Sequence, residues 1–419
     1  MMFLSVPRCL NWTRLGVSQV LIGLVLISLY FSSALSNLFE FTAVILVATS
    51  KALRGRVRDF ILSPLAKWYG LFLLVLILGA VNGILRGNSD LGEMWGWRKV
   101  LLLPLGAALF MGEEAAKRRL AMGFVAVSIV FALWSNINFL IGLNPVVAKN
   151  YAVQGILFTV AVLFCIEFFS ESKSTKVKVV GIVTAGLLTV SVFYLTSGRS
   201  GYLAWLVGVP LCLLLQSLSG SATRKIAISS AALVIGLMFV YSSQTGRAAV
   251  LSGLAEIQVT QSQERVSRLE TNAEAQQLST RMGDRYNMWG KTVEMLPSYG
   301  FAGAGLAGFA RVYDHHWKPV DDINWQGLGD PHNQYLKIAV ELGVPGLLVF
   351  LALLLVLIRS GLRQRFLRGV GVGVLFIWCS TSFFSSHFTT FHEGHFIWLF
   401  LGIFIAPNID SYKSAASRN

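Results

Sequence analysis

Apolar and polar positions follow one another along this chain in long blocks, not in the short periods of a soluble fold. About twelve apolar runs approach the roughly 20 residues that an α-helix needs to cross a bilayer, and short charged segments separate them. We predict spans near Leu15–Phe31, Leu35–Ser50, Trp68–Leu85, Val100–Met111, Ala121–Leu143, Tyr151–Phe169, Val179–Thr196, Tyr202–Leu218, Ile226–Tyr241, Val344–Ile358, Gly369–Phe384 and Phe396–Ala406. The pattern predicts an all-α polytopic membrane protein.

Composition and charge support this fold class. Of 419 residues, 54% are hydrophobic and 13% are charged, whereas soluble domains carry about 25% charged residues. The net charge of +14 could indicate a nucleic-acid partner, but the basic residues form short clusters between apolar runs. The clusters therefore indicate membrane topology, and no nucleic-acid partner is expected.

Basic clusters occupy alternate connections between the predicted spans. They fall within residues 51–67, 117–119, 173–178, 224–225, 359–368 and 413–418. The positive-inside rule places these connections and both termini in the cytoplasm. The first apolar run follows Arg8 and Arg14 and could be a signal peptide, but a second run follows at once, and cleavage near Ala34 would leave the remaining topology unchanged. The four cysteines show no metal or redox spacing.

One connection, of about a hundred residues, is far longer than the usual helix–helix link. Its middle part, from Gln261 to Leu296, has helical periodicity, and Pro297 with the following glycines ends that pattern. We therefore divide the chain into helices one to nine (1–241), a partly helical loop domain outside the cytoplasm (242–340), helices ten to twelve (341–408) and a cytoplasmic tail (409–419). A folded insertion of this size favours a functional site.

All six histidines fall on the outer side of this topology. His315, His316 and His332 lie in the long connection, and His387, His392 and His395 lie around the last outer connection. The last three could form a zinc site, although their spacing matches no common metal pattern. The alternative is that they are merely tolerated near the membrane interface.

The segment Asp330-Pro331-His332-Asn333 precedes a predicted span. Because Pro331 disfavours helix at Asp330, we expect His332 in the first turn of a helix that enters the membrane. An imidazole there could be a general base near neutral pH. The alternative is a capping arrangement, in which Asp330 and Asn333 accept backbone hydrogen bonds and His332 has no chemical role.

Three arginines complete the candidate site. Arg199 lies between Gly198 and Ser200 at the outer end of a span, where a cation is costly unless it has an anionic partner; a snorkelling side chain is the alternative. Arg281 and Arg285 are four residues apart and so share one helix face. Paired guanidinium groups suit a pyrophosphate, whereas the alternative is an ordinary solvated helix.

These motifs, in this order and topology, resemble the O-antigen ligase family of membrane glycosyltransferases, which includes related polymerases and has a GT-C-type architecture. The resemblance covers Thr196 to Gly346 by motif and the whole chain by hydropathy. It implies that His332 is the catalytic base, that Arg199 and Arg285 bind pyrophosphate, and that Arg281 is a further member of this site. It also implies transfer of a glycan from undecaprenyl pyrophosphate at the periplasmic face of the bacterial inner membrane, in lipopolysaccharide biosynthesis.

The outer connections contain no Asp-x-Asp pair, so we expect arginines to stabilise the leaving diphosphate without a metal or other cofactor. Asp321, Asp322, Asp330 and Glu393 are the possible ligands if a metal is needed. A single displacement would invert the anomeric centre. The short tail favours the lipid A core as the acceptor. A polymerase that uses a second lipid-linked glycan and a lipid-linked oligosaccharide flippase are the alternatives.

Overall fold

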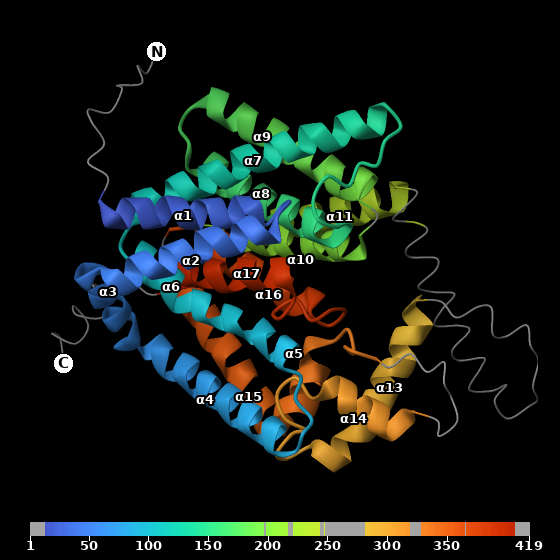
Figure 1. Cartoon of the computed structure of the whole chain (residues 1–419). Coiled ribbons are helices and arrows are strands. Elements are labelled where there is room, and N and C mark those ends of the chain that lie inside the picture. The colour runs from blue at the N-terminus through green and yellow to red at the C-terminus, as the bar shows by residue number, and fades with distance from the viewer. Residues whose placement is uncertain are drawn as a thin grey trace, which may run out of the picture.

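The structure is a computed structural model that describes residues 13–196, 198–216, 221–243, 247, 281–318, 328–364 and 366–406, without the side chains of 170, 171, 281–284, 286 and 287. All regular elements in these ranges are helical (Figure 1). They are α1 (Arg14–Ser28), α2 (Ser33–Thr49), α3 (Lys51–Ile61), α4 (Pro64–Leu85), α5 (Leu91–Gly96), η1 (Trp97–Leu101), α6 (Leu102–Phe110), α7 (Glu114–Leu140), α8 (Tyr151–Glu171), α9 (Thr175–Val190), η2 (Ser191–Leu195), α10 (Arg199–Leu215), α11 (Ala222–Ser242), α13 (Arg281–Tyr299), α14 (Phe309–Trp317), α15 (Gln334–Arg363), α16 (Arg368–Thr381), α17 (Phe391–Phe400) and η4 (Leu401–Ile405).

Each predicted span coincides with a helix, so the all-α polytopic class is confirmed. Six helices in the described ranges are long and apolar enough to cross a membrane, and a bent pair, α2 with α3, makes a seventh. Four more apolar stretches, at Arg14–Ser28, Arg199–Leu215, Arg368–Thr381 and Phe391–Ile405, are shorter. Length and composition alone therefore support fewer full crossings than the twelve predicted.

Neither the predicted span at Leu35–Ser50 nor the one at Val100–Met111 is a single straight α-helix long enough to cross a membrane. The span at Leu35–Ser50 continues into α3 through a bend of 95°, where Ser50 ends α2 and its side chain accepts the N–H of Leu53 at the start of α3. The span at Val100–Met111 is a composite of η1 and the nine-residue α6. Since about 20 helical residues are needed to cross a bilayer, α6 alone is too short.

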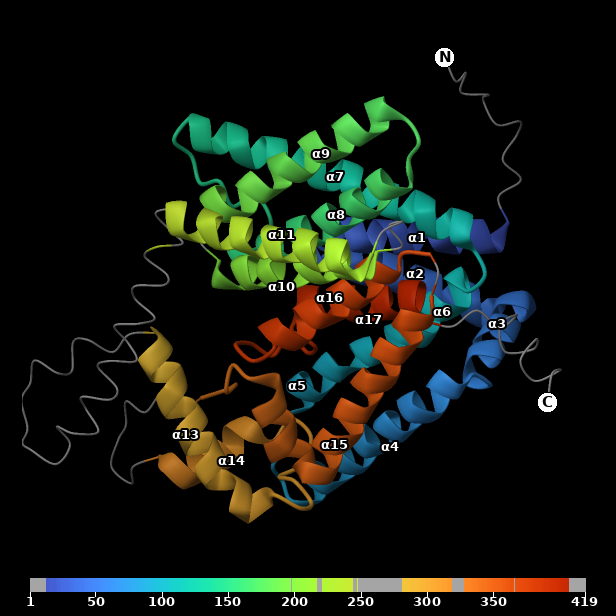
Figure 2. The same cartoon turned by 180° about the vertical axis from the view of Figure 1, so that it is seen from behind.

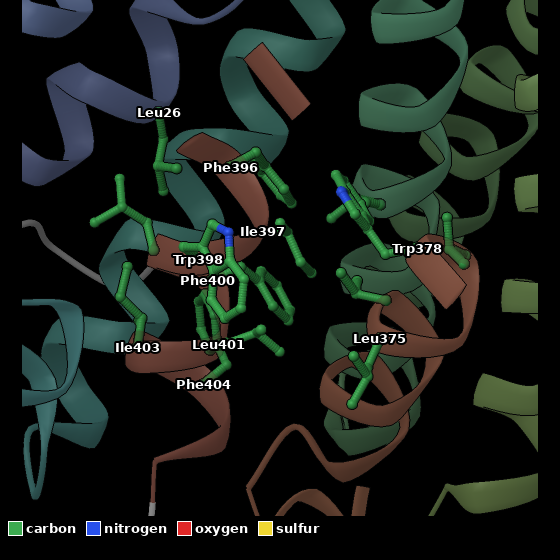
Figure 3. Packing of buried hydrophobic residues seen from close by; sticks show 14 of the residues in the cluster. Leu26, Leu375, Trp378, Phe396, Ile397, Trp398, Phe400, Leu401, Ile403 and Phe404 are labelled. Carbon is green, nitrogen blue, oxygen red and sulfur yellow. The ribbon is translucent and has the colours of Figure 1, made fainter. Parts of the chain in front are cut away.

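The last helix lies in the middle of the bundle. Trp378 of α16 and Trp398 of α17 are both fully buried (Figure 3), and every residue of α17 after Phe391 and every residue of η4 is buried. A helix that is apolar all round belongs inside a bundle. Gly106 and Gly402 allow α6 and η4 to pack closely, because a Cβ at Gly402 would lie only 2.2 Å from the Leu103 carbonyl oxygen.

The helices α13 and α14 pack together beside the first turns of α15 (Figures 1 and 2). We call this part of the molecule the α13–α14 end. The long α15 has non-helical backbone at Gly343 (φ 72°, ψ 175°), where a Cβ would clash with the Phe301 carbonyl oxygen at 2.3 Å. The break lets Ala304 N–H donate to the Val340 carbonyl at 2.8 Å. This contact joins the α13–α14 pair to the bundle.

Candidate functional site

The residues before α15 form a capped turn. Asn333 is the N-cap, and its Oδ1 accepts the N–H groups of Tyr335 at 3.0 Å and Leu336 at 3.1 Å. His332 therefore precedes the helix, so the expectation that it lies in the first helical turn is wrong. Its φ is 50°, in the left-handed region where His is one of the more frequent non-glycine residues. The imidazole is exposed, so a substrate can reach it.

Asp330 connects this turn to three other elements. Its Oδ1 accepts the backbone N–H of His332 at 2.7 Å and the hydroxyl of Ser386 at 2.8 Å. Its Oδ2 lies 3.0 Å from Nζ of Lys337 in α15, and that ammonium is also 3.4 Å from Oε2 of Glu93 in α5. The capping contacts that the sequence analysis left open are thus present, but the carboxylate of Asp330 also fixes the position of His332 relative to α5, α15 and the 382–390 loop.

Arg285 lies near this turn because α13 docks on it. Trp289, one turn after Arg285, donates from Nε1 to the Pro331 carbonyl at 3.0 Å, and its ring packs against Phe384 with centroids 5.9 Å apart. Partial desolvation lowers the pKa of His332 from 6.5; Asp330 opposes this, and the positive charges of Arg285 and Lys337 add to it. The structure therefore brings His332 and Arg285 into one electrostatic environment.

The charge of Arg285 also acts on the 382–390 loop. His387 of this loop is 2% exposed, and its Nδ1 lies 3.7 Å from Oε1 of Glu393. Burial lowers the pKa of His387, Glu393 and Asp330 raise it, and Arg285 lowers it further. His387 therefore shares two charged neighbours, Asp330 and Arg285, with the candidate base His332.

Arg281 is the first residue of α13, so the prediction that it shares a helix with Arg285 is confirmed. Its side chain lies outside the described part of the structure. Val293 of α13 is 50% exposed, and the buried face of this helix is formed by Thr292 and Met295.

Arg199 is the first residue of α10, after Gly198. The close approach of α10 to α8 requires glycine at position 201, because a Cβ at Gly201 would lie 2.9 Å from the Gly155 Cα. The pairs of close approach between α10 and α16, at Gly208 with Ile377 and at Cys212 with Gly369, make these helices antiparallel. Arg199 therefore lies at the same end of this pair as the 382–390 loop.

The hypothetical zinc site is not supported by the positions of its three histidines. His387 has Glu393 as its carboxylate neighbour, whereas Nε2 of His395 lies 3.0 Å from Oε2 of Glu40 in α2. His392 packs against Phe391. Among the described residues, no group of three His, Cys, Asp or Glu side chains could hold a metal. The other proposed ligands, Asp321 and Asp322, lie outside the described residues.

Lys337 is a member of the site that the sequence pattern did not indicate. It is 6% exposed and lies four residues before the fully buried Glu341. Two ionisable residues one turn apart at the start of an apolar run were the available signal, since such charges are costly in a membrane helix without partners. Glu93 and Ser386 had no comparable signal, because only the tertiary contacts bring them to Asp330.

Comparison with known families bears on these positions. Residues 184–351 match the family model described as O-Antigen ligase. No curated protein matches the chain. The matched segment runs from α9 into α15 and so contains Arg199, Arg281, Arg285 and His332. The chain is a multi-pass membrane protein, and its segment 184–351 matches the O-antigen ligase family.

Proposed function

We propose that the protein is an O-antigen ligase that transfers a glycan from undecaprenyl pyrophosphate to a sugar hydroxyl of the lipid A core. The observation that carries this proposal is the accessible His332 imidazole beside the cationic Arg285, within the segment that matches the family. A neutral imidazole and a fixed guanidinium are the two groups that this reaction needs.

In the proposed reaction, His332 accepts the proton of the attacking hydroxyl group. The acceptor oxygen forms a bond to the anomeric carbon while the bond from that carbon to the diphosphate oxygen breaks. The electron pair leaves with the diphosphate, whose growing charge Arg285 and Arg199 stabilise, with Arg281 as a third candidate. One displacement inverts the anomeric configuration. No divalent metal is required in this scheme.

We place the site at the periplasmic face of the inner membrane. The basic α3, with Lys51, Arg54 and Arg58, lies at the start of α4, whereas Asn82 near the end of α4 donates to the Gly303 carbonyl at the α13–α14 end. The positive-inside rule assigns α3 to the cytoplasm. The opposite end of α4, and with it His332, would then face the periplasm.

The positions of buried ionisable residues bear on the transporter alternative. Among the described residues, six lysine and glutamate side chains are less than 9% exposed, namely Lys99, Lys117, Glu167, Lys337, Glu341 and Glu393. Four of them, Lys99, Lys337, Glu341 and Glu393, gather at the first turns of α15 and α17 and in η1, whereas Lys117 and Glu167 lie near the ends of α7 and α8 on the side of α3 and the start of α16. A transport path would instead place such residues along several spans, so the position of these four favours a site at one end of the bundle.

Reconstitution tests the proposal. Purified protein in liposomes is supplied with undecaprenyl-pyrophosphate glycan and rough lipopolysaccharide. A ligase joins the glycan to the lipid A core, a polymerase lengthens the lipid-linked glycan without lipopolysaccharide, and a flippase only moves the donor across the bilayer. Transport without any new glycosidic bond would disprove the enzymatic proposal.

A further inference from the structure

A groove of about 950 Å³ runs along α2 and faces the surface of the bundle. Its other wall is formed by α3, α5, η1 and α6. It exists because α2 packs against α1 and then bends away by 95° into α3, while α6 packs inward against η4 and α17. Phe41 and Val44 of α2 and Leu101 of η1 line the groove and are 67%, 43% and 56% exposed. The walls therefore offer an apolar surface to a lipid chain.

Arginines line both ends of the groove: Arg54 and Arg58 of α3 lie at one end, and Arg98 lies with Glu40 of α2 at the other, which we call the mouth. The Arg98 guanidinium lies 5.1 Å from the centroid of the Trp95 ring, and its NH2 donates to Oδ1 of Asn37 across the groove at 2.8 Å. Trp95 shares the short α5 with Glu93, whose carboxylate lies 3.4 Å from Lys337 in the candidate site. The mouth therefore opens at the end of the bundle where His332 lies.

We propose that this groove binds the polyisoprenoid chain of the lipid diphosphate donor, with Arg98 beside the diphosphate at its mouth. This inference rests on the proposed function and adds the binding site for the lipid part of the donor. The apolar walls suit an uncharged isoprenoid chain, and the guanidinium at the mouth has charge opposite to that of the diphosphate.

The length of the groove distinguishes this occupant from an ordinary phospholipid. Its lining on α2 runs from Asn37 to Ala48, which at about 1.5 Å per residue is about 17 Å. It then continues onto Val57 and Ile61 of α3. Half of a bilayer core is about 15 Å thick, so the groove extends beyond one leaflet. A long isoprenoid chain fills it, whereas the acyl chain of a phospholipid ends near the midplane.

Filling the groove tests the proposal. Val44→Trp and Ala48→Trp place an indole between the walls at positions that are exposed in this structure. The assay compares one glycan on undecaprenyl diphosphate with the same glycan on geranyl diphosphate. We expect the KM for the long-chain donor to rise at least tenfold, equivalent to about 1.4 kcal/mol, while kcat and the KM for the short-chain donor change by less than about twofold.

A second apolar groove provides the matched control. It has a volume of about 720 Å³, lies between α1 and α7, and is lined by Val20, which is 47% exposed. Val20→Trp should change the KM for neither donor. Arg98→Gln should raise the KM for both donors, because both carry the diphosphate. Equal effects of Val20→Trp and Val44→Trp, or equal rises for both donors in Val44→Trp, would overturn the proposal.

Cross-linking separates this inference from the proposed function. A photoreactive amino acid at position 41, in place of Phe41, should capture undecaprenyl diphosphate, and one at position 20 should not. Capture at position 41 in a protein that forms no glycosidic bond would support the groove and disprove the ligase. Turnover of both donors, with capture of phospholipid alone at position 41, would support the ligase and disprove the groove as the binding site of the donor chain.

Discussion

The backbone N–H of His332 donates a 2.7 Å hydrogen bond to Oδ1 of Asp330, and His332 keeps a φ of 50° directly before the N-cap of α15. The same carboxylate accepts the Ser386 hydroxyl and pairs with Lys337. Asp330 therefore holds the imidazole on the loop side of the helix terminus. This position depends on the contacts of Asp330 with the 382–390 loop and with α15 and, through Lys337, on α5.

The first prediction separates catalysis from capping. His332→Ala should lower kcat by about a hundredfold to ten-thousandfold, the usual contribution of a general base, and leave donor binding unchanged. Asn333→Ala removes the cap and should instead cost about 1 kcal/mol of stability, with a lower Tm and most of the activity retained. If a well-expressed His332→Ala protein ligated at a near-normal rate, His332 would have no catalytic role, and the turn before α15 would be a capping arrangement only.

The second prediction concerns the arginines. Hydrogen bonds to charged groups contribute about 1.5–3 kcal/mol, so Arg285→Ala and Arg199→Ala should each lower kcat/KM by roughly ten- to hundredfold. Lysine at either position should restore little, because an ammonium cannot make the two-pronged contact. Donor affinity measured by calorimetry on the His332→Ala background separates binding from turnover. Unchanged affinity in the Arg199→Ala protein would remove Arg199 from the diphosphate site.

The third prediction is a pair of opposite pH shifts. His332 must be neutral to act as a base, and its pKa is lowered from 6.5, so kcat/KM should rise with pH on the acid side and be level at neutral pH. Asp330 raises this pKa and Arg285 lowers it. Asp330→Asn should therefore move the acid limb to lower pH, and Arg285→Gln should move it to higher pH. Ser386→Ala keeps the charge of Asp330 and should leave the limb in place.

A fourth prediction addresses metal dependence. If guanidinium groups stabilise the leaving diphosphate, the activity of the purified enzyme should survive EDTA. Chelation that abolishes activity, followed by recovery on addition of Mg²⁺ or Mn²⁺, would assign a ligand role to Asp321, Asp322, Asp330 or Glu393.

The fifth prediction tests orientation. Glu294 of α13 and Lys51 of α3 are both exposed and belong to opposite ends of α4. In cells with a permeabilised outer membrane, Glu294→Cys should react with an impermeant thiol reagent, and Lys51→Cys should react only after lysis of the inner membrane. The reverse pattern would contradict a periplasmic site.

Several features of this protein were determined by its sequence alone. Apolar runs can satisfy their backbone hydrogen bonds in lipid only as helices, so the helical class and the approximate position of each span could be predicted. Pro331 indicated that no helix includes Asp330, and the motif order identified the family segment that the comparison with known families confirms.

Other features were decided by tertiary packing. The sequence could not indicate that α2 bends by 95° or that η4 lies inside the bundle, because apolar residues suit both lipid and protein interior equally well. The left-handed backbone of His332 depends on Asp330, and the contacts of Asp330 come from Ser386, 56 residues away, and from Lys337. The sequence shows which charged residues lie in apolar segments and so need a hydrogen-bonding or oppositely charged neighbour. Only the packing of the helices decides which residue that neighbour is.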